Sequence, residues 1–312
     1  MPLTLADIEH ARVRIAGAVR RTPVVEAVPA GDPLPGRVAL KLECLQVTGS
    51  FKPRGATNAL RSLDPATAAR GLVTASGGNH GLAVGYVGQQ AGLPTTIFLP
   101  ESVTPAKVER LKAFGATVRV TGRVWDDSNA AALAHAAESG QAYIHPFADP
   151  AVMAGQGTLG LEILDQVPDA DTILVAIGGG GLAAGLATAA KALRPDIRIV
   201  GIEPTGAPTL LESRRAGRLV TLGEITTRAG TLAPRTSAPE TFQLIESHVD
   251  DIVLVDDEAM REGARWLWLE HNVAAELSGA AAVAALQTGA YRPAAKERVV
   301  AIVCGVGTDG IG

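Results

Sequence analysis

Lys52 is the residue in this sequence that is best suited to covalent chemistry. It lies between Phe51 and Pro53, so it is not part of a charged face exposed to solvent. Pro53 suits the first positions of a helix, and Ser50 is a possible N-cap just upstream. A helix N-terminus disfavours a cation, and partial burial lowers the pKa of an amine further. The pattern predicts a Schiff-base lysine, and the alternative is an ordinary lysine that snorkels to solvent.

A run of four glycines predicts an anion site. It comprises Gly178, Gly179, Gly180 and Gly181, and is called the tetraglycine below. The run follows an apolar stretch at residues 173–177 and precedes an expected helix at residues 182–193. Glycines leave the backbone N–H groups bare, so these groups can converge on a phosphate at the positive end of the helix. The alternative is a turn in which the glycines only allow tight packing.

The tetraglycine alone does not decide which phosphate it binds. A dinucleotide site would need a Gly-x-Gly-x-x-Gly pattern and an acid about twenty residues later. Glu203 is close to the expected position of that acid, but the third glycine of the pattern falls on Ala183, a tolerated variant. A nicotinamide-binding oxidoreductase therefore stays open as an alternative, although it leaves Lys52 without a role.

A second turn between a strand and a helix predicts a site for a carboxylate. It is called the Ser-Gly-Gly-Asn loop here and consists of Ser76, Gly77, Gly78, Asn79 and His80. Asn79 can cap the following helix, while the residues before it expose further N–H donors. A phosphate site together with a carboxylate site fits a phosphorylated cofactor and an amino-acid substrate. Alternatively, the stretch is only a capped turn, and His80 is a structural histidine.

Cys304 follows the last apolar stretch, at residues 298–303. In parallel sheets, ligands lie at the carboxyl ends of the strands, so a polar side chain there would face the binding crevice. A buried thiol that merely fills space is the alternative.

Strands and helices alternate along most of the chain, which predicts parallel sheets covered by helices. A helix capped by Thr4 and Asp7 should end near Gly17, and a strand should cover residues 38–43. Further strands are expected at 72–75, 95–99, 117–120, 142–144, 172–177, 198–202, 251–255 and 298–303. Further helices are expected at 79–91, 105–114, 126–139, 150–167, 182–193, 207–216, 257–271 and 278–288.

The order of these elements predicts two lobes. Residues 1–62 and 149–312 should form the larger lobe, which binds the cofactor, and residues 70–148 the smaller lobe, which carries the Ser-Gly-Gly-Asn loop. Residues 217–248 are the least regular part of the chain, with Pro234, Pro239 and several threonines. We interpret them as a long functional loop.

Composition narrows the possible partners and locations. The 312 residues are 47% hydrophobic and carry a net charge of −4 without a basic run, so we expect neither a nucleic-acid partner nor a membrane partner. Two cysteines, Cys44 and Cys304, make a disulfide framework implausible, and the N-terminal stretch lacks the apolar core of a signal peptide. A cytoplasmic protein follows, and a homodimer is possible.

Taken together, these motifs resemble the fold-type II pyridoxal-phosphate enzymes, in particular the serine/threonine dehydratase (ammonia-lyase) group, which also contains serine racemases. The resemblance runs from Thr4 to Asp309 and implies a two-lobed α/β fold like that of the tryptophan synthase β-subunit. It also implies that pyridoxal 5'-phosphate is the cofactor, that Lys52 forms the internal aldimine and that Phe51 packs near the cofactor ring. The tetraglycine would hold the cofactor phosphate.

The resemblance assigns roles to the remaining motifs as well. Asn79 would hydrogen-bond the ring hydroxyl, and the Ser-Gly-Gly-Asn loop (Ser76, Gly77, Gly78, Asn79 and His80) would take the substrate carboxylate. Cys304 stands where the family often has a serine that faces the pyridine nitrogen.

The sequence departs from the family pattern at several positions. Gly77 occupies the place where racemases carry a second serine that handles a proton, and the tail reads Cys-Gly-Val-Gly. Glu203 matches the first acid of the family's divalent-metal site, but Thr209 replaces the second, which puts metal binding in doubt. Leu277 replaces the usual proline of a Glu-Pro-Ser-Gly motif. No regulatory domain is expected after Asp309, and therefore no feedback by isoleucine.

The expected activity is the elimination of water and then ammonia from a small β-hydroxy amino acid, such as L-threonine or L-serine. A serine or hydroxyaspartate racemase/dehydratase of the same fold is the alternative within the family. Outside the family, the alternatives are the nicotinamide-dependent oxidoreductase and a cofactor-loaded binding protein without turnover.

Overall fold

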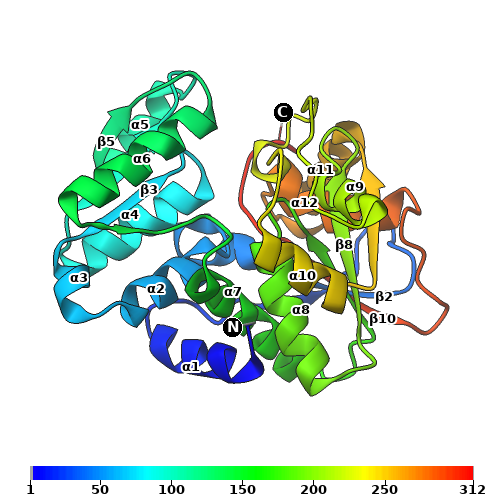
Figure 1. The fold of residues 1–312 in the computed structure, drawn as a ribbon. Helices are drawn as coiled ribbons and strands as arrows, with labels where there is room; N and C mark the ends of the chain where they lie inside the picture. Colours follow the sequence, from blue (N-terminus) through cyan, green and yellow to red (C-terminus); the bar gives the residue numbers. More distant parts are fainter. Residues whose placement is uncertain (1–2, 312) are drawn as a thin grey trace.

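The computed structural model describes residues 3–311 of the chain, which fold around two separate β-sheets (Figure 1). The strands are β1 (Val24–Glu26), β2 (Arg37–Lys41), β3 (Leu72–Ala75), β4 (Thr95–Leu99), β5 (Thr117–Val120), β6 (Ala142–Tyr143), β7 (Thr172–Ala176), β8 (Arg198–Pro204), β9 (Asp251–Val255) and β10 (Arg298–Ile302).

Helices cover both sheets. They are α1 (Leu5–Ile15), α2 (Lys52–Ser62), α3 (Pro65–Ala69), α4 (Asn79–Ala91), α5 (Pro105–Lys112), α6 (Trp125–Ser139), α7 (Pro150–Gln166), α8 (Gly181–Leu193), α9 (Thr209–Ala216), α10 (Pro239–His248), α11 (Asp257–His271) and α12 (Leu277–Gln287). Short 3₁₀ helices occur at Glu43–Leu45, Val47–Gly49 and Gly230–Leu232. No helix within residues 3–311 is long and apolar enough to cross a membrane.

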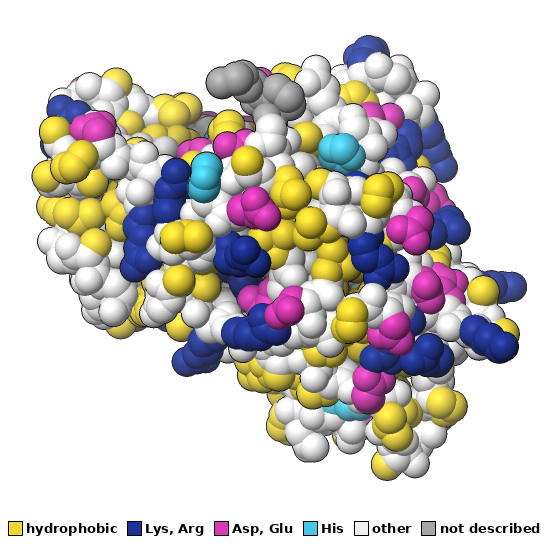
Figure 2. All heavy atoms as spheres, turned by 90° about the horizontal axis from the view of Figure 1, so that it is seen from below, with side chains coloured by type: hydrophobic (Ala, Val, Ile, Leu, Met, Phe, Trp, Pro, Cys, Tyr) yellow, Lys and Arg dark blue, Asp and Glu magenta, His cyan; other side chains and the backbone are white. Residues whose placement is uncertain are grey.

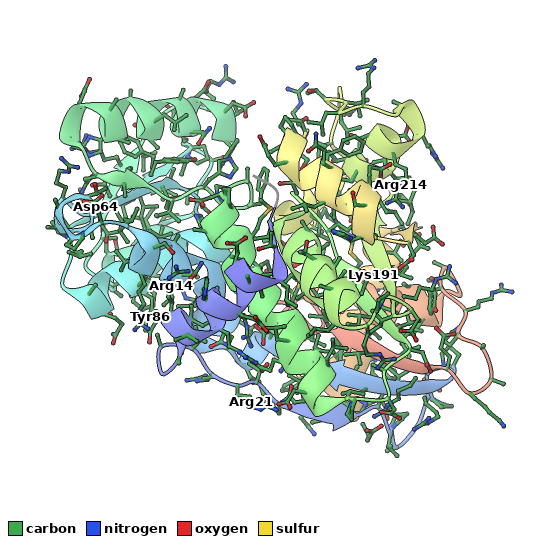
Figure 3. All side chains as sticks on the ribbon, turned by 60° about the horizontal axis from the view of Figure 1, so that its bottom comes forward. Arg14, Arg21, Asp64, Tyr86, Lys191 and Arg214 are labelled. Atoms are coloured by element: carbon green, nitrogen blue, oxygen red, sulfur yellow. The ribbon has the colours of Figure 1, made fainter. Side chains whose placement is uncertain are left out.

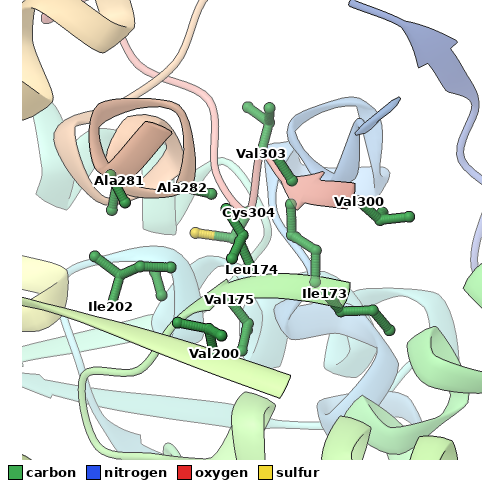
Figure 4. Packing of buried hydrophobic residues seen from close by; sticks show 14 of the residues in the cluster. Ile173, Leu174, Val175, Val200, Ile202, Ala281, Ala282, Val300, Val303 and Cys304 are labelled. Carbon is green, nitrogen blue, oxygen red and sulfur yellow. The ribbon is translucent and has the colours of Figure 1, made fainter. Parts of the chain in front are cut away.

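The larger sheet has six strands in the order β1-β2-β10-β7-β8-β9. Its strands are parallel except for β1, which pairs antiparallel with β2 at the edge. The central strands β7 and β10 are buried along their whole length, as expected for a parallel sheet with helices on both faces. Figure 4 shows part of this core, where Leu174 of β7 and Ala281 and Ala282 of α12 surround Cys304.

The smaller sheet has four parallel strands in the order β5-β4-β3-β6. With α4, α5 and α6 it forms the cyan and green part of Figure 1. We call this part the smaller unit, and the elements around the six-stranded sheet the larger unit.

Helix α2 lies where the two units meet. Its buried Ala56, Ala59 and Leu60 form one apolar cluster with residues of the smaller unit, such as Leu72 of β3, and with Val152 of α7. Helix α1 packs beneath this junction and crosses α7 and α8, as Figures 1 and 3 show. Lys52 is the first residue of α2, so it lies close to the junction.

The expectation of an α/β fold with two mostly parallel sheets is confirmed. The first helix is confirmed as well, because Thr4 and Asp7 form a reciprocal capping box at its start. Part of the prediction for residues 217–248 is wrong, because the last ten of them form α10 rather than a loop. Pro239, which we took as a loop signal, suits the first turn of that helix, where its missing N–H costs nothing.

Candidate active site

Lys52 opens helix α2, as the sequence predicted, but Ser50 does not cap the helix. The N-cap is Phe51, and no side chain bonds to the first-turn amides from that position. Ser50 is extended, with φ −159° and ψ 167°, and its backbone forms a bridge with Gly305. Its buried hydroxyl has no hydrogen-bond partner among residues 3–311. The cap prediction was wrong because Phe51, with helical φ −59° and ψ −18°, lies between Ser50 and α2 and takes the N-cap position.

The amine of Lys52 is partly buried and has few partners. Its Nζ donates a hydrogen bond to the carbonyl oxygen of Pro146 at 2.7 Å and lies 5.0 Å from the centroid of the Phe51 ring. Burial lowers the pKa of this amine to about 8, and the nearby carboxylate of Glu276 offsets only part of that effect. Roughly a tenth of the amine is therefore neutral, and thus nucleophilic, at pH 7, which is far more than for a lysine in solution.

A buried group of charges anchors the start of α2. The guanidinium of Arg54 donates to both oxygens of Glu43, at 2.7 and 2.8 Å, and lies 3.0 Å from Glu162 of α7. Lys41 of β2 pairs with Glu162 on the other side. Two cations and two carboxylates thus compensate one another, and they tie α2 to β2 and α7. We call these four residues the buried charge network.

The tetraglycine forms the turn between β7 and α8, as expected. Gly178 and Gly180 adopt the left-handed region, with φ of 56° and 93°, which favours glycine. The amides of Gly178, Gly179 and Gly181 make no hydrogen bond to a backbone carbonyl of residues 3–311. These free donors at the positive end of α8 suit an anion. A Cβ on Gly179 would overlap the ring of Phe147, so larger residues would also disturb the turn.

The Ser-Gly-Gly-Asn loop joins β3 to α4, but Asn79 does not cap the helix. The N-cap is Gly78, and Asn79 is the first helical residue. The side-chain nitrogen of Asn79 donates instead to Oε1 of Glu276 at 2.8 Å. The oxygen of Ser76 accepts a hydrogen bond from the amide of Gly78 at 3.3 Å. The cap prediction was wrong because the helix begins at Asn79 itself rather than after it, so Gly78 takes the N-cap position and Asn79 is already helical.

His80 is buried beneath the loop. Its Nε2 lies 3.0 Å from the carbonyl oxygen of Ile144, which can only accept, so Nε2 carries the proton. Burial and the charge of Lys52 lower the pKa of this ring to about 3. The ring is therefore neutral and its only N–H is already bound. The backbone amide of His80 is then the group of this residue that could bind a substrate carboxylate.

Cys304 follows β10 and is buried. Its thiol donates to the carbonyl oxygen of Ser278 at 3.3 Å, and its own carbonyl accepts from the amide of Phe51 at 3.3 Å. Burial raises the pKa of the thiol well above its ordinary value, so the group stays protonated and uncharged. The structure therefore brings Cys304 close to the segment that carries Lys52.

The sequence did not single out several residues of this site. Pro146 and Phe147 lie in the segment between β6 and α7, where they contact Lys52 and the tetraglycine. Glu276 precedes α12, and the sequence marks it only as the first residue of the motif in which Leu277 replaces proline. Pro146 and Phe147 follow β6, the last strand of the smaller sheet in chain order. This position could have identified them, since ligands bind at the carboxyl ends of parallel strands. No local signal connects Glu276 to Asn79.

Glu203, which the sequence suggested for a ribose site and for a metal site, is hydrogen-bonded to the start of α9. Its two oxygens accept the amides of Leu210 and Leu211 at the start of α9, both at 2.9 Å. Thr209 donates its hydroxyl proton to the carbonyl oxygen of Pro234. Both oxygens of Glu203 are therefore already engaged by the first turn of α9. No group of three or more His, Cys, Asp or Glu residues within 3–311 is arranged to hold a metal ion.

Comparisons with known proteins agree on one family. The family described as "Pyridoxal-phosphate dependent enzyme" matches residues 15–305. The chain is 41% identical to the L-threonine ammonia-lyase of Geobacter sulfurreducens, over 92% of this chain and 71% of that protein. It superposes on maize serine racemase with a TM-score of 0.92 and 33% identity, covering 98% of this chain and 94% of the other. A solved threonine deaminase from T.th. gives a TM-score of 0.89 and 36% identity, with coverage of 97% and 98%.

Proposed function

Because the chain belongs to the family of pyridoxal-phosphate dependent enzymes, we propose that it converts a small β-hydroxy amino acid, such as L-threonine or L-serine, into a 2-oxo acid and ammonia. The observation that carries this proposal is the partly buried amine of Lys52, whose pKa is lowered to about 8, at the junction of the two units. The names of its relatives, an L-threonine ammonia-lyase and a threonine deaminase, support the choice of substrate class.

The residues of the site fit pyridoxal phosphate, which is the cofactor of this family. Lys52 can bind its aldehyde group, because the amine is partly neutral and its hydrogen bond is to a carbonyl rather than to a carboxylate. The free amides of the tetraglycine can bind its phosphate at the N-terminus of α8. When bound, the cofactor supplies an electron sink for the pair left on the substrate Cα.

The chain's own groups would then bind, orient and move protons. Backbone amides of the Ser-Gly-Gly-Asn loop bind the substrate carboxylate, and Nζ of Lys52 takes the Cα proton. Cys304 remains an uncharged thiol, and a thiol is too weak a donor to keep the pyridine nitrogen protonated. Beside a bound cofactor, this uncharged thiol would favour loss of the β-hydroxyl as water over reactions that return a proton to Cα.

Racemisation is the second candidate, because the fold is so similar to that of maize serine racemase. Racemisation needs a proton donor on the side of the substrate opposite Lys52. Gly77 has no side chain to supply one, whereas the resemblance places a serine there in racemases. We therefore propose a dehydratase with little racemase activity.

An assay of the purified protein with pyridoxal phosphate tests the proposal. Incubation with L-threonine, L-serine and 3-hydroxyaspartate should release 2-oxo acid and ammonia, and chiral analysis should find far less D-serine than keto acid. D-Serine formed at a comparable rate would favour the racemase instead. Cofactor binding without either product would identify a binding protein, and hydride transfer to a nicotinamide would identify the oxidoreductase.

We also propose the setting in which the enzyme works. The larger lobe would comprise residues 1–62 and 149–312, and the smaller lobe residues 70–148.

Two free, buried cysteines support a cytoplasmic location, where thiols stay reduced. Exposed apolar side chains such as Trp268 and Leu269 on α11 support a homodimer, which light scattering would test. Figure 2 shows one face on which acidic and basic side chains are mixed, which supports the expectation of no nucleic-acid partner.

A further inference from the structure

A hydrogen-bonded chain of side chains crosses the site from the larger to the smaller unit. Thr231 donates to the hydroxyl of Ser278 at 2.7 Å, and Ser278 donates to Oε1 of Glu276 at 2.6 Å. The same oxygen accepts the side-chain amide of Asn79 at 2.8 Å. Asn79 begins α4 in the smaller unit, whereas Glu276 precedes α12 in the larger unit. The carboxylate therefore connects the two units at the candidate site.

Glu276 is held firmly in this position. Its backbone amide donates to the carbonyl oxygen of Gly305, and a Cβ added to Gly305 would overlap Oε1 of Glu276. Burial raises the pKa of Glu276, while the hydrogen bonds from Ser278 and Asn79 act in the opposite direction. The donors around the carboxylate therefore compensate part of its desolvation.

An ionised carboxylate can only accept hydrogen bonds, so it selects one of the two orientations of the Asn79 amide. The nitrogen of Asn79 must face Glu276, because its carbonyl oxygen would be repelled. The amide nitrogen has two protons, and only one of them is donated to Glu276. The second proton is left for another acceptor.

We propose that Glu276 is a positioning residue, which orients the Asn79 amide so that its second N–H can bind the oxygen on the cofactor ring. The inference rests on the proposed binding of pyridoxal phosphate at this site, but not on the reaction that follows. Glu276 acts through Asn79, so its loss should affect cofactor binding only while Asn79 is present.

A double-mutant cycle on cofactor affinity tests this inference. The dissociation constant for pyridoxal phosphate should rise about tenfold in Asn79→Ala, the scale expected for one hydrogen bond to a charged group. It should rise similarly in Glu276→Ala, and no further in the double variant. The absorption maximum of the bound cofactor should shift in both single variants. Glu276→Gln keeps an acceptor oxygen and should retain the wild-type spectrum and affinity.

Glu270→Ala is the matched control, because Glu270 also accepts an amide from a distant segment, that of Gly31, but does not contact Asn79. It should leave the dissociation constant unchanged. Independent effects that multiply to about a hundredfold in the double variant would overturn the inference, and so would Glu276→Gln behaving like Glu276→Ala.

A second measurement applies if Glu276→Ala does not fold. Asn79→Asp places two carboxylates against each other and should lower the melting temperature of the cofactor-free protein. Adding Glu276→Gln to that variant should restore the melting temperature, because a donor then faces an acceptor again. Absence of rescue would contradict the contact. Both measurements are independent of turnover, so they remain informative even if the wild-type protein binds cofactor and releases no 2-oxo acid.

Discussion

At the residue scale, the chemistry depends on the protonation of Lys52. A solution lysine is almost fully protonated at neutral pH, whereas burial lowers the pKa of this amine to about 8. The lowered pKa arises from desolvation, and the carboxylate of Glu276 acts in the opposite direction. The environment of Lys52 thus matters as much as its identity.

Covalent capture of pyridoxal phosphate by Lys52 should depend on pH with a midpoint near 8. The neutral amine is the nucleophile, so capture should be slow below that pH and level off above it, rather than rise toward 10.5. Stopped-flow absorbance of the cofactor-free protein would measure the rate at each pH. Borohydride reduction and peptide mapping should then place the cofactor on Lys52, and Lys52→Arg should capture none. A label on another lysine would contradict the assignment.

Gly77→Ser should raise the ratio of racemisation to elimination. The added hydroxyl offers a proton donor on the side opposite Lys52, and room for it exists. A Cβ at Gly77 would lie 3.2 Å from the tip of Leu99 and 3.5 Å from Val103, contacts that a flexible side chain can relieve. Chiral chromatography of D-serine beside a keto-acid assay gives the ratio. Gly78→Ser, at a position with no atom within 4 Å, is the matched control and should leave the ratio unchanged.

At the element scale, α2 and α9 depend on buried carboxylates at their start. The buried charge network ties α2 to β2 and α7, and Glu203 accepts the first amides of α9. In both cases a buried carboxylate fixes the start of a helix, through ion pairs for α2 and through backbone amides for α9.

Arg54→Met should destabilise the protein by about 3–5 kcal/mol, the cost of leaving a buried charge without its partner. Glu43 is fully buried and would keep only the hydroxyl of Thr22 and the more distant Lys41 as compensation. Urea unfolding followed by circular dichroism measures the loss. The double variant Arg54→Met with Glu43→Leu should recover part of it. Arg261→Met breaks an exposed pair on α11 and should change the stability little. Equal effects of the two arginine variants would refute the argument.

Glu203 should make the stability fall as the pH rises. Burial raises its pKa in the folded protein to about 7, above the ordinary 4.5, so the folded state binds the extra proton. The contribution is complete below about pH 4.5 and is lost as the pH rises through 7, by roughly 3 kcal/mol in total. Glu203→Gln cannot titrate, so its unfolding free energy should depend less on pH between 5 and 8. Parallel pH profiles of the two proteins would rule this out.

At the scale of the whole molecule, the candidate site is assembled from both units. The larger unit contributes the tetraglycine, Cys304 and Glu276, and the smaller unit contributes the Ser-Gly-Gly-Asn loop. Lys52 and Pro146 meet at the junction between them. A ligand bound there contacts both units and should stabilise them together.

Pyridoxal phosphate should therefore raise the melting temperature of the cofactor-free protein as a single transition. At one hundred times its dissociation constant, a ligand stabilises the folded state by about 2.7 kcal/mol. Pyridoxal without the phosphate should give a smaller shift, because the tetraglycine then has no anion to bind. Lys52→Ala should keep part of the phosphate-dependent shift. Differential scanning calorimetry measures all three, and equal shifts for the two ligands would argue against the tetraglycine as the phosphate site.

The sequence alone determined the elements whose signals are local. The strands β3, β5 and β9 and the helices α4 and α11 have the predicted bounds, because their apolar residues recur at strand or helix spacing and turn residues mark their ends. The tetraglycine and the place of Lys52 at a helix start were predicted for the same reason. The exposed amides of the tetraglycine and the helix start at Lys52 both result from backbone conformations that neighbouring residues determine.

Only the tertiary structure decided which distant groups meet. Asn79 bonds to Glu276, which is 197 residues away, and not to its own helix. The carbonyl of Pro146 reaches Lys52 across 94 residues, and Glu203 accepts two amides at the start of α9. Such partners arise from the docking of separate strands and helices. The partner of a side chain is then the acceptor or donor that lies nearest in space. No local pattern in the sequence encodes that distance.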